Sequence, residues 1–574
     1  MSVSAGRRSG ASGCTASSRF VVAIALMSAV GGFAAGAFGQ GYDRSAATTS
    51  ARSMVLARRG MICASQPLAA EAGLAVLRAG GNAFDAAVAA AAVLNVVEPM
   101  STGIGGDMYA LAWSAKEGRL VGLNGSGRSA AAATVARYRE LGLDAIPTHG
   151  PHAITVPGAF HGWATLIENH GSLPLGAILA DAIRHADEGF AVSEVIAENW
   201  QGGLVHREVA EFARTYLVRD GDDWRAPRLG EIVRQPDLAR TFRALAAGGI
   251  DTFYRGEIAQ RIAAFLESEG SLIRAVDLAK HSSTFVAPVS TDYRGYVLHE
   301  LPPNGQGIVA LEMLNILEGY DLRALGHNST GYVHLLAEAK KLAFADRDTF
   351  ITDLDYRKLP VETLISKPYA ERMRARIDRG RAGRFEKSTL EIGDDTVYLA
   401  TADRDGNMVS FINSLFYGFG SGLVVPGTGI CLQNRGALFR LDDAHRNRIE
   451  PSKRPLHTII PAFVTRDGKP WLCYGVMGGD MQPQGHVQVL VNLVDFGMNP
   501  QEAGEAARVR EADGAVFVEN GVAAATIDGL RALGHRVERA ANAFGGYQGI
   551  LVDRERGVYL GGSDNRKDGC ALGY

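Results

Sequence analysis

Hydrophobic and polar positions along the chain follow two patterns. Four segments have two apolar, partly alternating runs joined by a short charged turn with glycine, which predicts β-hairpins at residues 108–123, 397–412, 462–476 and 549–562. Helical periodicity dominates the region from about residue 163 to residue 381. Because one hairpin lies early and three lie late, we expect an α+β layered sandwich. Its sheets would draw strands from both ends of the chain, with helices outside.

Residues 67–97 predict two consecutive helices. Pro67 suits a first helical turn, Gly80 and Gly81 end the first helix, and Asn82 can cap the second. The second segment is apolar but short for a bilayer span, so we expect a buried helix.

Composition narrows the class of protein. The chain has 574 residues, 47% of them hydrophobic and 21% charged, which is ordinary for a soluble globular protein. The net charge is -3 and no basic run with interleaved aromatic residues occurs, so we expect no nucleic-acid partner. Five scattered cysteines are too few for a disulfide scaffold.

The N-terminus has the features of an export signal. Arg7, Arg8 and Arg19 precede an uncharged run over residues 20–42, in which small residues offer a cleavage site near Ala37 to Gly39. This pattern predicts a signal peptide over residues 1–39 and a periplasmic or secreted protein. The alternative is an uncleaved membrane anchor, because the run is about long enough to span a bilayer.

Familiar catalytic motifs are absent or weak. The glycine-rich stretch Thr102–Asp107 lacks the spacing of a nucleotide-binding loop and predicts a tight turn that enters a strand. The pair His149 and His152 has no further metal-ligand motif beside it. No G-x-S-x-G elbow occurs. We expect neither a cofactor nor a metal ion.

Thr396 stands where a charged stretch ends and a strand pattern begins. A threonine hydroxyl needs a base, and a threonine at a chain terminus carries one in its own α-amine, with a reference pKa of about 7.7–8.0. Cleavage between Asp395 and Thr396 would expose that amine, and residues 374–395 read as an accessible tether. From the residues alone, the competing interpretation is that Thr396 is simply the first residue of an ordinary strand.

Longer motifs decide between these interpretations. They include "PLAAEAGLAVLRAGGNAFDAAVAAAAVLNVVEPMSTGIGGD", "VPGAFHGWATLIENHGSLPL", "DRDGNMVSFINSLFYGFGSG", "KRPLHTIIP" and "MGGDMQPQGHVQVLVNLVDFGMNPQEA". With these segments, in this order, the chain resembles the γ-glutamyltransferase family of N-terminal-nucleophile hydrolases from about Met54 to Tyr574.

The resemblance implies a fold, a maturation and an activity. Such enzymes fold as a four-layer αββα sandwich and cut their own precursor into two subunits that stay together. Here these would be residues 40–395 and residues 396–574. The implied reaction transfers the acyl group of a glutathione-like γ-glutamyl amide to water or to an amino-acid acceptor.

Catalytic roles follow from the resemblance, residue by residue. Thr396 matches the nucleophile, and Ser414 matches a hydroxyl residue that hydrogen-bonds it. Gly478 and Gly479 match the pair whose backbone forms the oxyanion hole, where one donor typically contributes about 2.7–4 kcal/mol.

The positions that would bind the α-carboxylate of a γ-glutamyl group depart from the family pattern. Ser126 stands at the position of the carboxylate-binding arginine, and Arg128 lies two residues further on. His457 and Thr458 replace a Ser-Ser pair.

The amine-binding positions depart more strongly, because Phe416, Arg435 and Leu438 replace polar and acidic residues. A substrate ammonium would meet no carboxylate there, and an unpaired polar group costs about 1–3 kcal/mol. These changes favour a small acidic amide without an α-amine, as in the divergent branch of cephalosporin or glutaryl acylases and oxamate amidohydrolase. Arg128, Arg435 and His457 would supply the positive charge. A non-catalytic protein that keeps the fold is a further alternative, which the intact set of predicted catalytic residues opposes.

Overall fold

Two antiparallel sheets of seven strands each form the centre of the molecule. The computed structural model describes residues 52–384, 395–540, 542 and 544–574, all within one compact unit, Asp43–Tyr574. The first sheet has the order β1 (Val55–Ala57), β22 (Val558–Ser563), β21 (Tyr547–Asp553), β17 (Lys469–Val476), β16 (Ala462–Arg466), β11 (Tyr296–Glu300), β10 (Val289–Tyr293). The second has the order β23 (Cys570–Gly573), β2 (Met61–Ala64), β12 (Asp395–Ala402), β13 (Met408–Phe416), β3 (Asp107–Ser114), β4 (Arg119–Gly125), β9 (Thr284–Val286).

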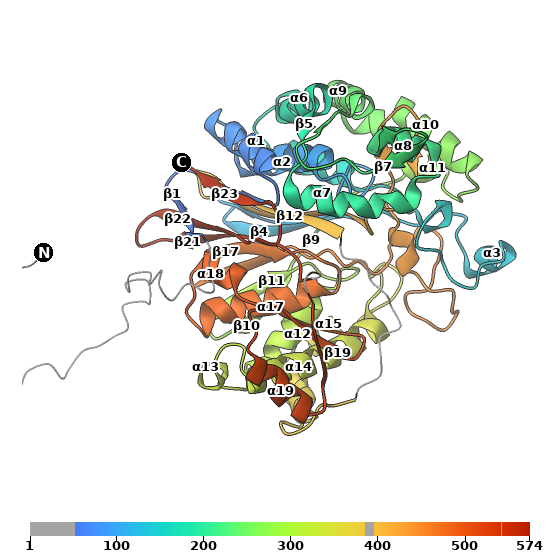
Figure 1. The fold of residues 1–574 in the computed structure, drawn as a ribbon. Coiled ribbons are helices and arrows are strands. Elements are labelled where there is room, and N and C mark those ends of the chain that lie inside the picture. The colour runs from blue at the N-terminus through green and yellow to red at the C-terminus, as the bar shows by residue number, and fades with distance from the viewer. Residues whose placement is uncertain (1–51, 385–394, 541, 543) are drawn as a thin grey trace, which may run out of the picture. The chain divides into compact units, whose positions relative to one another are not determined.

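Helices cover the outer face of each sheet (Figure 1). On the second sheet lie α1 (Pro67–Arg78), α2 (Ala83–Val97) and α4 (Ala159–His170), which share one hydrophobic core with the outward residues of its strands. On the first sheet lie α12 (Gly307–Leu317) and α17 (Met481–Val494), and α14 (Thr330–Phe350) packs against α12. These three helices share a second core with the first sheet. A third apolar cluster, which includes Tyr109, Tyr398 and Phe463, fills the space between the sheets. The predicted four-layer αββα sandwich is confirmed.

Smaller elements complete the described chain. The remaining helices are α3 (Val135–Glu140), α5 (Leu175–Ile178), α6 (Ala180–Glu188), α7 (Glu194–Trp200), α8 (Ala210–Tyr216), α9 (Pro236–Tyr254), α10 (Glu257–Ser268), α11 (Ala275–Ala279), α13 (Leu322–Leu325), α15 (Val361–Leu364), α16 (Lys367–Arg374), α18 (Pro500–Glu505) and α19 (Ala524–Ala532). Short 3₁₀ turns are η1 (Pro151–Ala153), η2 (Gln201–His206) and η3 (Arg435–Leu438). Minor sheets pair β5 (Phe190–Ala191) with β8 (Ile232–Val233), β6 (Val218–Asp220) with β7 (Asp223–Arg225), β14 (Val424–Val425) with β15 (Ile430–Cys431), and β18 (Val509–Ala512) with β19 (Ala515–Val518) and β20 (Arg536–Arg539).

The local signals in the sequence act as expected. Pro67 begins α1, and Asn82 caps α2 in a capping box with Asp85, whose side chain accepts from the Asn82 N–H (2.9 Å). All four predicted hairpins form, as β3–β4, β12–β13, β16–β17 and β21–β22. Another hairpin of the first sheet, β10–β11, comes from the middle of the chain and was not predicted.

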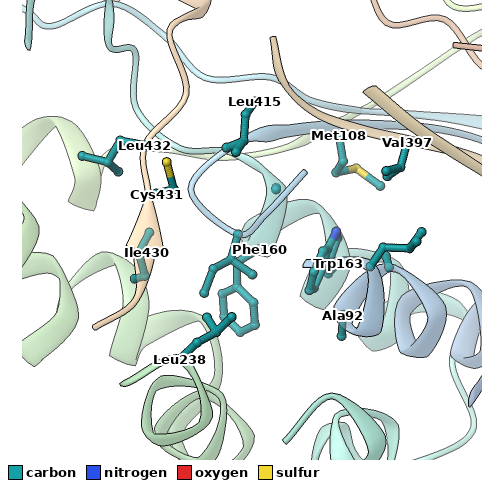
Figure 2. Packing of buried hydrophobic residues seen from close by; sticks show 14 of the residues in the cluster. Ala92, Met108, Phe160, Trp163, Leu238, Val397, Leu415, Ile430, Cys431 and Leu432 are labelled. Carbon is teal, nitrogen blue, oxygen red and sulfur yellow. The ribbon is translucent and has the colours of Figure 1, made fainter. Parts of the chain in front are cut away.

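Packing against the helices sets which way β12 faces. Figure 2 shows Val397 and Met108 on the side of the second sheet that packs against Trp163 and Ala92. Because side chains alternate along a strand, the next residue, Tyr398, points to the other side and belongs to the cluster between the sheets. One face of β12 therefore packs against the helices, and the opposite face points toward the first sheet.

Three sequence predictions fall partly or wholly outside the described residues. The signal peptide over 1–39 is one, and the charged segment before Thr396 is another, of which residues 385–394 lie outside the described part of the chain. Among the described residues, no helix is both long and apolar enough to cross a membrane. The third concerns the five cysteines, of which Cys14 lies outside the described residues. The other four, Cys63, Cys431, Cys473 and Cys570, are free thiols.

Candidate active site

Thr396 and Ser414 meet on neighbouring strands of the second sheet. Thr396 is 2% exposed, and its Oγ1 donates a hydrogen bond to Ser414 Oγ (3.2 Å). The register of β12 against β13 shifts between Asp395 and Val397, so Thr396 sits at a bulge. Bulges re-aim side chains and are frequent beside active sites. The peptide bond proposed for cleavage thus lies at an irregular point of an otherwise regular strand.

Arg435 is a buried cation beside this pair. Its Nη2 donates to Ser414 Oγ (3.0 Å) and its Nη1 donates to Thr458 Oγ1 (2.7 Å). Burial lowers the pKa of the guanidinium to about 10, against the opposing effect of Asp107, so Arg435 is charged at neutral pH. Among the described residues it forms no ion pair, and its Nε has no hydrogen-bond partner.

Phe416 supports Arg435 from one side. The guanidinium carbon lies 4.4 Å from the centroid of the Phe416 ring, a distance typical of a cation–π contact. The Phe416 N–H donates to Ser414 Oγ (2.8 Å), and the residue has a φ of 89°. A bulky residue in this region is strained, and such strain clusters at functional sites. The sequence placed Phe416, Arg435 and Thr458 in the site, and the structure brings all three together with Ser414.

Asp107 is a charged residue of this region that sequence reasoning missed. It is fully buried, and its Oδ1 accepts from the backbone N–H of Gly127 (2.9 Å) and Gly158 (3.2 Å). Its Oδ2 lies 3.1 Å from His457 Nε2. Burial raises the pKa of the Asp107 carboxyl to about 7, although Arg435 and the two N–H groups act in the opposite direction. The predicted turn into a strand is confirmed, because β3 begins at Asp107.

His457 has partners on both ring nitrogens. The Ile459 N–H donates to Nδ1 (3.3 Å), which leaves the proton on Nε2 to donate to Asp107. Burial lowers the pKa of His457 well below its usual value. The imidazole is therefore neutral and bound to protein, and direct contact of His457 with a substrate stays a prediction.

Gln306 joins the predicted oxyanion-hole glycines to the rest of the site. Its Nε2 donates to the carbonyl oxygens of Thr458 (2.8 Å) and Gly479 (3.0 Å), and its Oε1 accepts from Arg347 Nη1 (2.9 Å). Gly478 and Gly479 have φ values of 105° and 49°, which glycine adopts without strain. Within the described residues, neither N–H donates a hydrogen bond. A hydrogen-bonded path thus runs from Thr396 through Ser414, Arg435, Thr458 and Gln306 to Gly479.

Arg128 is engaged elsewhere. Its guanidinium pairs with Asp353 (3.2 Å) and Asp355 (2.9 Å) and donates to the Ser452 carbonyl (3.2 Å). These two carboxylates balance its charge. The contacts of Arg128 therefore do not support its predicted role in substrate binding, which stays a prediction.

One group in the described part of the chain has the composition of a metal site. His334, Glu338 and His535 have ligand atoms within 4.8 Å of one another. His334 Nδ1 is hydrogen-bonded to His535 Nε2 (2.8 Å), and Lys341 donates to Glu338 (2.7 Å). His149 and His152 do not belong to this group.

Comparison with known proteins places this arrangement in a family. The family model described as gamma-glutamyltranspeptidase matches residues 69–574. The chain belongs to the gamma-glutamyltranspeptidase family. It is an enzyme of this family of N-terminal-nucleophile hydrolases, with the amidohydrolase or acylase chemistry of its members.

Individual members of the gamma-glutamyltranspeptidase family resemble the chain over most of its length. It is 39% identical over 530 residues to the glutathione hydrolase-like YwrD proenzyme of Bacillus subtilis, covering 90% of this chain and 99% of that protein. It is 36% identical to the oxamate amidohydrolase proenzyme of Klebsiella pneumoniae, covering 90% and 98%. The crystal structure of cephalosporin acylase from Bacillus halodurans matches with a TM-score of 0.87 and 44% identity, covering 92% and 98%.

Proposed function

We propose that the protein is a self-processing amidohydrolase that uses Thr396 as an N-terminal nucleophile. Its substrate would be an amide whose acyl group carries a carboxylate and no adjacent ammonium. The observation that carries this proposal is Arg435, a buried cation without an ion-pair partner among the described residues, bonded to the serine that contacts Thr396. An acyl carboxylate is the counter-ion that such a site lacks.

Maturation would precede catalysis. In the precursor, Thr396 Oγ1 attacks the carbonyl carbon of Asp395, the peptide C–N bond breaks, and the nitrogen takes a proton to become the α-amine. Water then hydrolyses the resulting ester. The products are a large subunit that ends at Asp395 and a small subunit that begins at Thr396.

Both subunits contribute to both sheets, which supports their staying together. In the second sheet β12 lies between β2 of the large subunit and β13 of the small one, and β13 in turn pairs with β3 of the large subunit. The names of the relatives describe proenzymes. The leader over residues 1–39 would export the precursor before or during these steps.

In the mature enzyme the same hydroxyl would attack the substrate amide. The Thr396 α-amine, with a reference pKa of about 7.7–8.0, accepts the hydroxyl proton and passes it to the leaving amine. The N–H groups of Gly478 and Gly479 stabilise the oxyanion, since they have no other acceptor among the described residues. Ser414 orients Thr396 Oγ1, and water completes hydrolysis of the acyl-enzyme.

Charge favours an acidic acyl group over a γ-glutamyl group. A γ-glutamyl group brings an ammonium, and Arg435 would repel it. Asp107, a buried carboxylate near Arg435, is already bonded to His457 and two N–H groups. One relative carries a name that fits the charge argument, the oxamate amidohydrolase of Klebsiella, because the acyl group of oxamate carries a carboxylate and no ammonium.

A substrate comparison on the processed protein tests the proposal. We expect kcat/KM for a glutaryl amide or for oxamate to exceed that for glutathione by about tenfold or more, which corresponds to roughly 1.4 kcal/mol. If glutathione is the better substrate, the acidic-amide assignment is wrong and glutathione hydrolysis takes its place. If the chain does not process and hydrolyses none of these amides, the non-catalytic alternative holds.

A further inference from the structure

Asp107 lies directly opposite Ser414 in the second sheet. The two residues are paired in the β3–β13 ladder, and side chains of paired residues project from the same face. Tyr109, two residues after Asp107, and Ile412, two before Ser414, both belong to the cluster between the sheets. Asp107 therefore faces the same layer as Ser414, to which Thr396 and Arg435 are bonded.

Asp107 is held in one orientation by polar contacts on both oxygens. Two backbone N–H groups bind Oδ1, and His457 binds Oδ2. The Ile459 N–H donates to His457 and fixes the orientation of its ring. The next residue in the chain, Thr458, accepts a hydrogen bond from Arg435. Both Asp107 and Arg435 thus have fixed positions in one hydrogen-bonded frame.

Among the groups that face Asp107, Arg435 is the cation whose charge an ionised Asp107 offsets inside the site. The titratable and charged side chains that face it are Arg435, Arg454, His457, Tyr109 and Tyr254. Burial raises the pKa of both tyrosines and lowers that of His457, so these three are neutral. Arg454 is engaged by the Ser126 and Ser282 carbonyls, to which it donates hydrogen bonds.

We infer that Asp107 is a positioning residue that sets, through its own charge, how tightly the site holds the carboxylate of an acidic acyl group. The inference rests on the proposed function and adds a regulating group to it. When Asp107 is neutral, the site presents the unopposed charge of Arg435 to the acyl carboxylate. When Asp107 is ionised, its negative charge offsets that of Arg435 and repels the acyl carboxylate.

The direction with pH follows from the burial of Asp107. With its pKa raised to about 7, Asp107 is mostly protonated at pH 6 and mostly ionised at pH 8.5. The preference for an acyl anion is then high at pH 6 and falls as the pH rises through 7. A bound carboxylate favours the protonated form, so binding and proton uptake are linked.

Two ligands that differ only in one carboxylate isolate the effect. Glutarate carries the acyl-end carboxylate, and pentanoate has a methyl group there. Both also carry a carboxylate at the reacting end. The ratio of their dissociation constants, measured by calorimetry on the processed enzyme from pH 6 to 8.5, cancels the titration of the Thr396 α-amine. Over this range the ligands themselves stay ionised, since such carboxyl groups have pKa values of about 4–5.

We expect the preference of the wild type for glutarate over pentanoate to fall by about tenfold between pH 6 and 8.5. In Asp107→Asn, which keeps the size and one acceptor oxygen, we expect the ratio to stay constant within about twofold. A purely structural role would weaken both ligands at every pH and leave the slope intact. A preference in the wild type that does not change with pH overturns the inference, even if the variant does not mature. An equal slope in Asp107→Asn also overturns it.

This outcome is separate from that of the proposed function. Binding of glutarate is measured without turnover, so a flat ratio with active hydrolysis of glutaryl amides rejects only the role of Asp107. Failure of glutarate to bind better than pentanoate at any pH rejects both.

Discussion

Replacing Arg435 by methionine removes the charge that the acidic-amide assignment requires. Methionine has a similar length, so it fills much of the space over Phe416 without adding a polar group. The change deletes the hydrogen bonds to Ser414 Oγ (3.0 Å) and Thr458 Oγ1 (2.7 Å) and the 4.4 Å contact with the Phe416 ring. These losses affect every substrate, whereas the lost attraction to an acyl carboxylate affects acidic substrates alone.

The size of the selective effect can be bounded. Two unit charges at 4 Å interact by about 4 kcal/mol at an effective dielectric of 20. Asp107 offsets part of this when it is ionised, and a hydrogen bond to a charged group typically contributes about 1.5–3 kcal/mol. We therefore expect kcat/KM for a glutaryl amide to fall by about 10- to 150-fold more than kcat/KM for the matched pentanoyl amide.

The assay compares the two amides on processed wild type and Arg435→Met at one pH. The control is Arg184→Met on α6, because Arg184 is about half exposed and pairs with Asp181 (2.8 Å) on the surface. We expect the control to leave both rates within about twofold, since an exposed ion pair contributes little. Equal losses for both amides in Arg435→Met would show that Arg435 only supports Ser414, and the charge argument would then be wrong.

Four further changes test other parts of the site. Thr396→Ala should remain a single chain on a denaturing gel, because the attacking hydroxyl is gone, whereas N-terminal sequencing of the wild type should find a fragment that starts at Thr396. Ser414→Ala should lower kcat by about tenfold or more in processed enzyme, and Ser414→Thr should keep most activity; unchanged turnover in the alanine variant would remove Ser414 from the site. Gln306→Ala loses the bonds to the Thr458 and Gly479 carbonyls, so kcat should fall by about tenfold with little change in KM, and a change in KM alone would argue against a role in the oxyanion hole. Arg128→Ala should change kcat/KM for an acidic amide by less than about threefold, because that charge is paired with two carboxylates; a loss above about tenfold would restore Arg128 as a substrate ligand.

The hairpins and the first two helices could be predicted from sequence because their signals are local. A period of two with a glycine turn, or a proline and a capping asparagine at a helix start, acts over a few residues. The hairpin β10–β11 was missed because its own local signal is weak. It lies at the edge of its sheet, its residues are largely half-buried, and the apolar alternation there is correspondingly weak.

Thr396, Ser414 and the two glycines could be placed by resemblance, because they stand in long matching segments. Asp107 and Gln306 could not. Asp107 ends a glycine-rich turn that the sequence explains by its structural role alone, and Gln306 directly precedes helix α12. What makes each of them part of the site is a partner far away in the chain: Ser414 across the β3–β13 ladder, and the carbonyl of Gly479.

The sequence by itself determined the layers, the family and the position of the candidate nucleophile. Hydrophobic periodicity and extended motifs can be recognised without knowing which distant residues are in contact. Only the tertiary structure decided the electrostatics of the site. Two arginines, Arg128 and Arg435, looked equally able to bind an anion. Arg128 is paired with two carboxylates, whereas Arg435 is buried without such a partner among the described residues. The energy of a charge depends on its solvation and on the charges beside it, and both are set by which strands and loops the fold brings together.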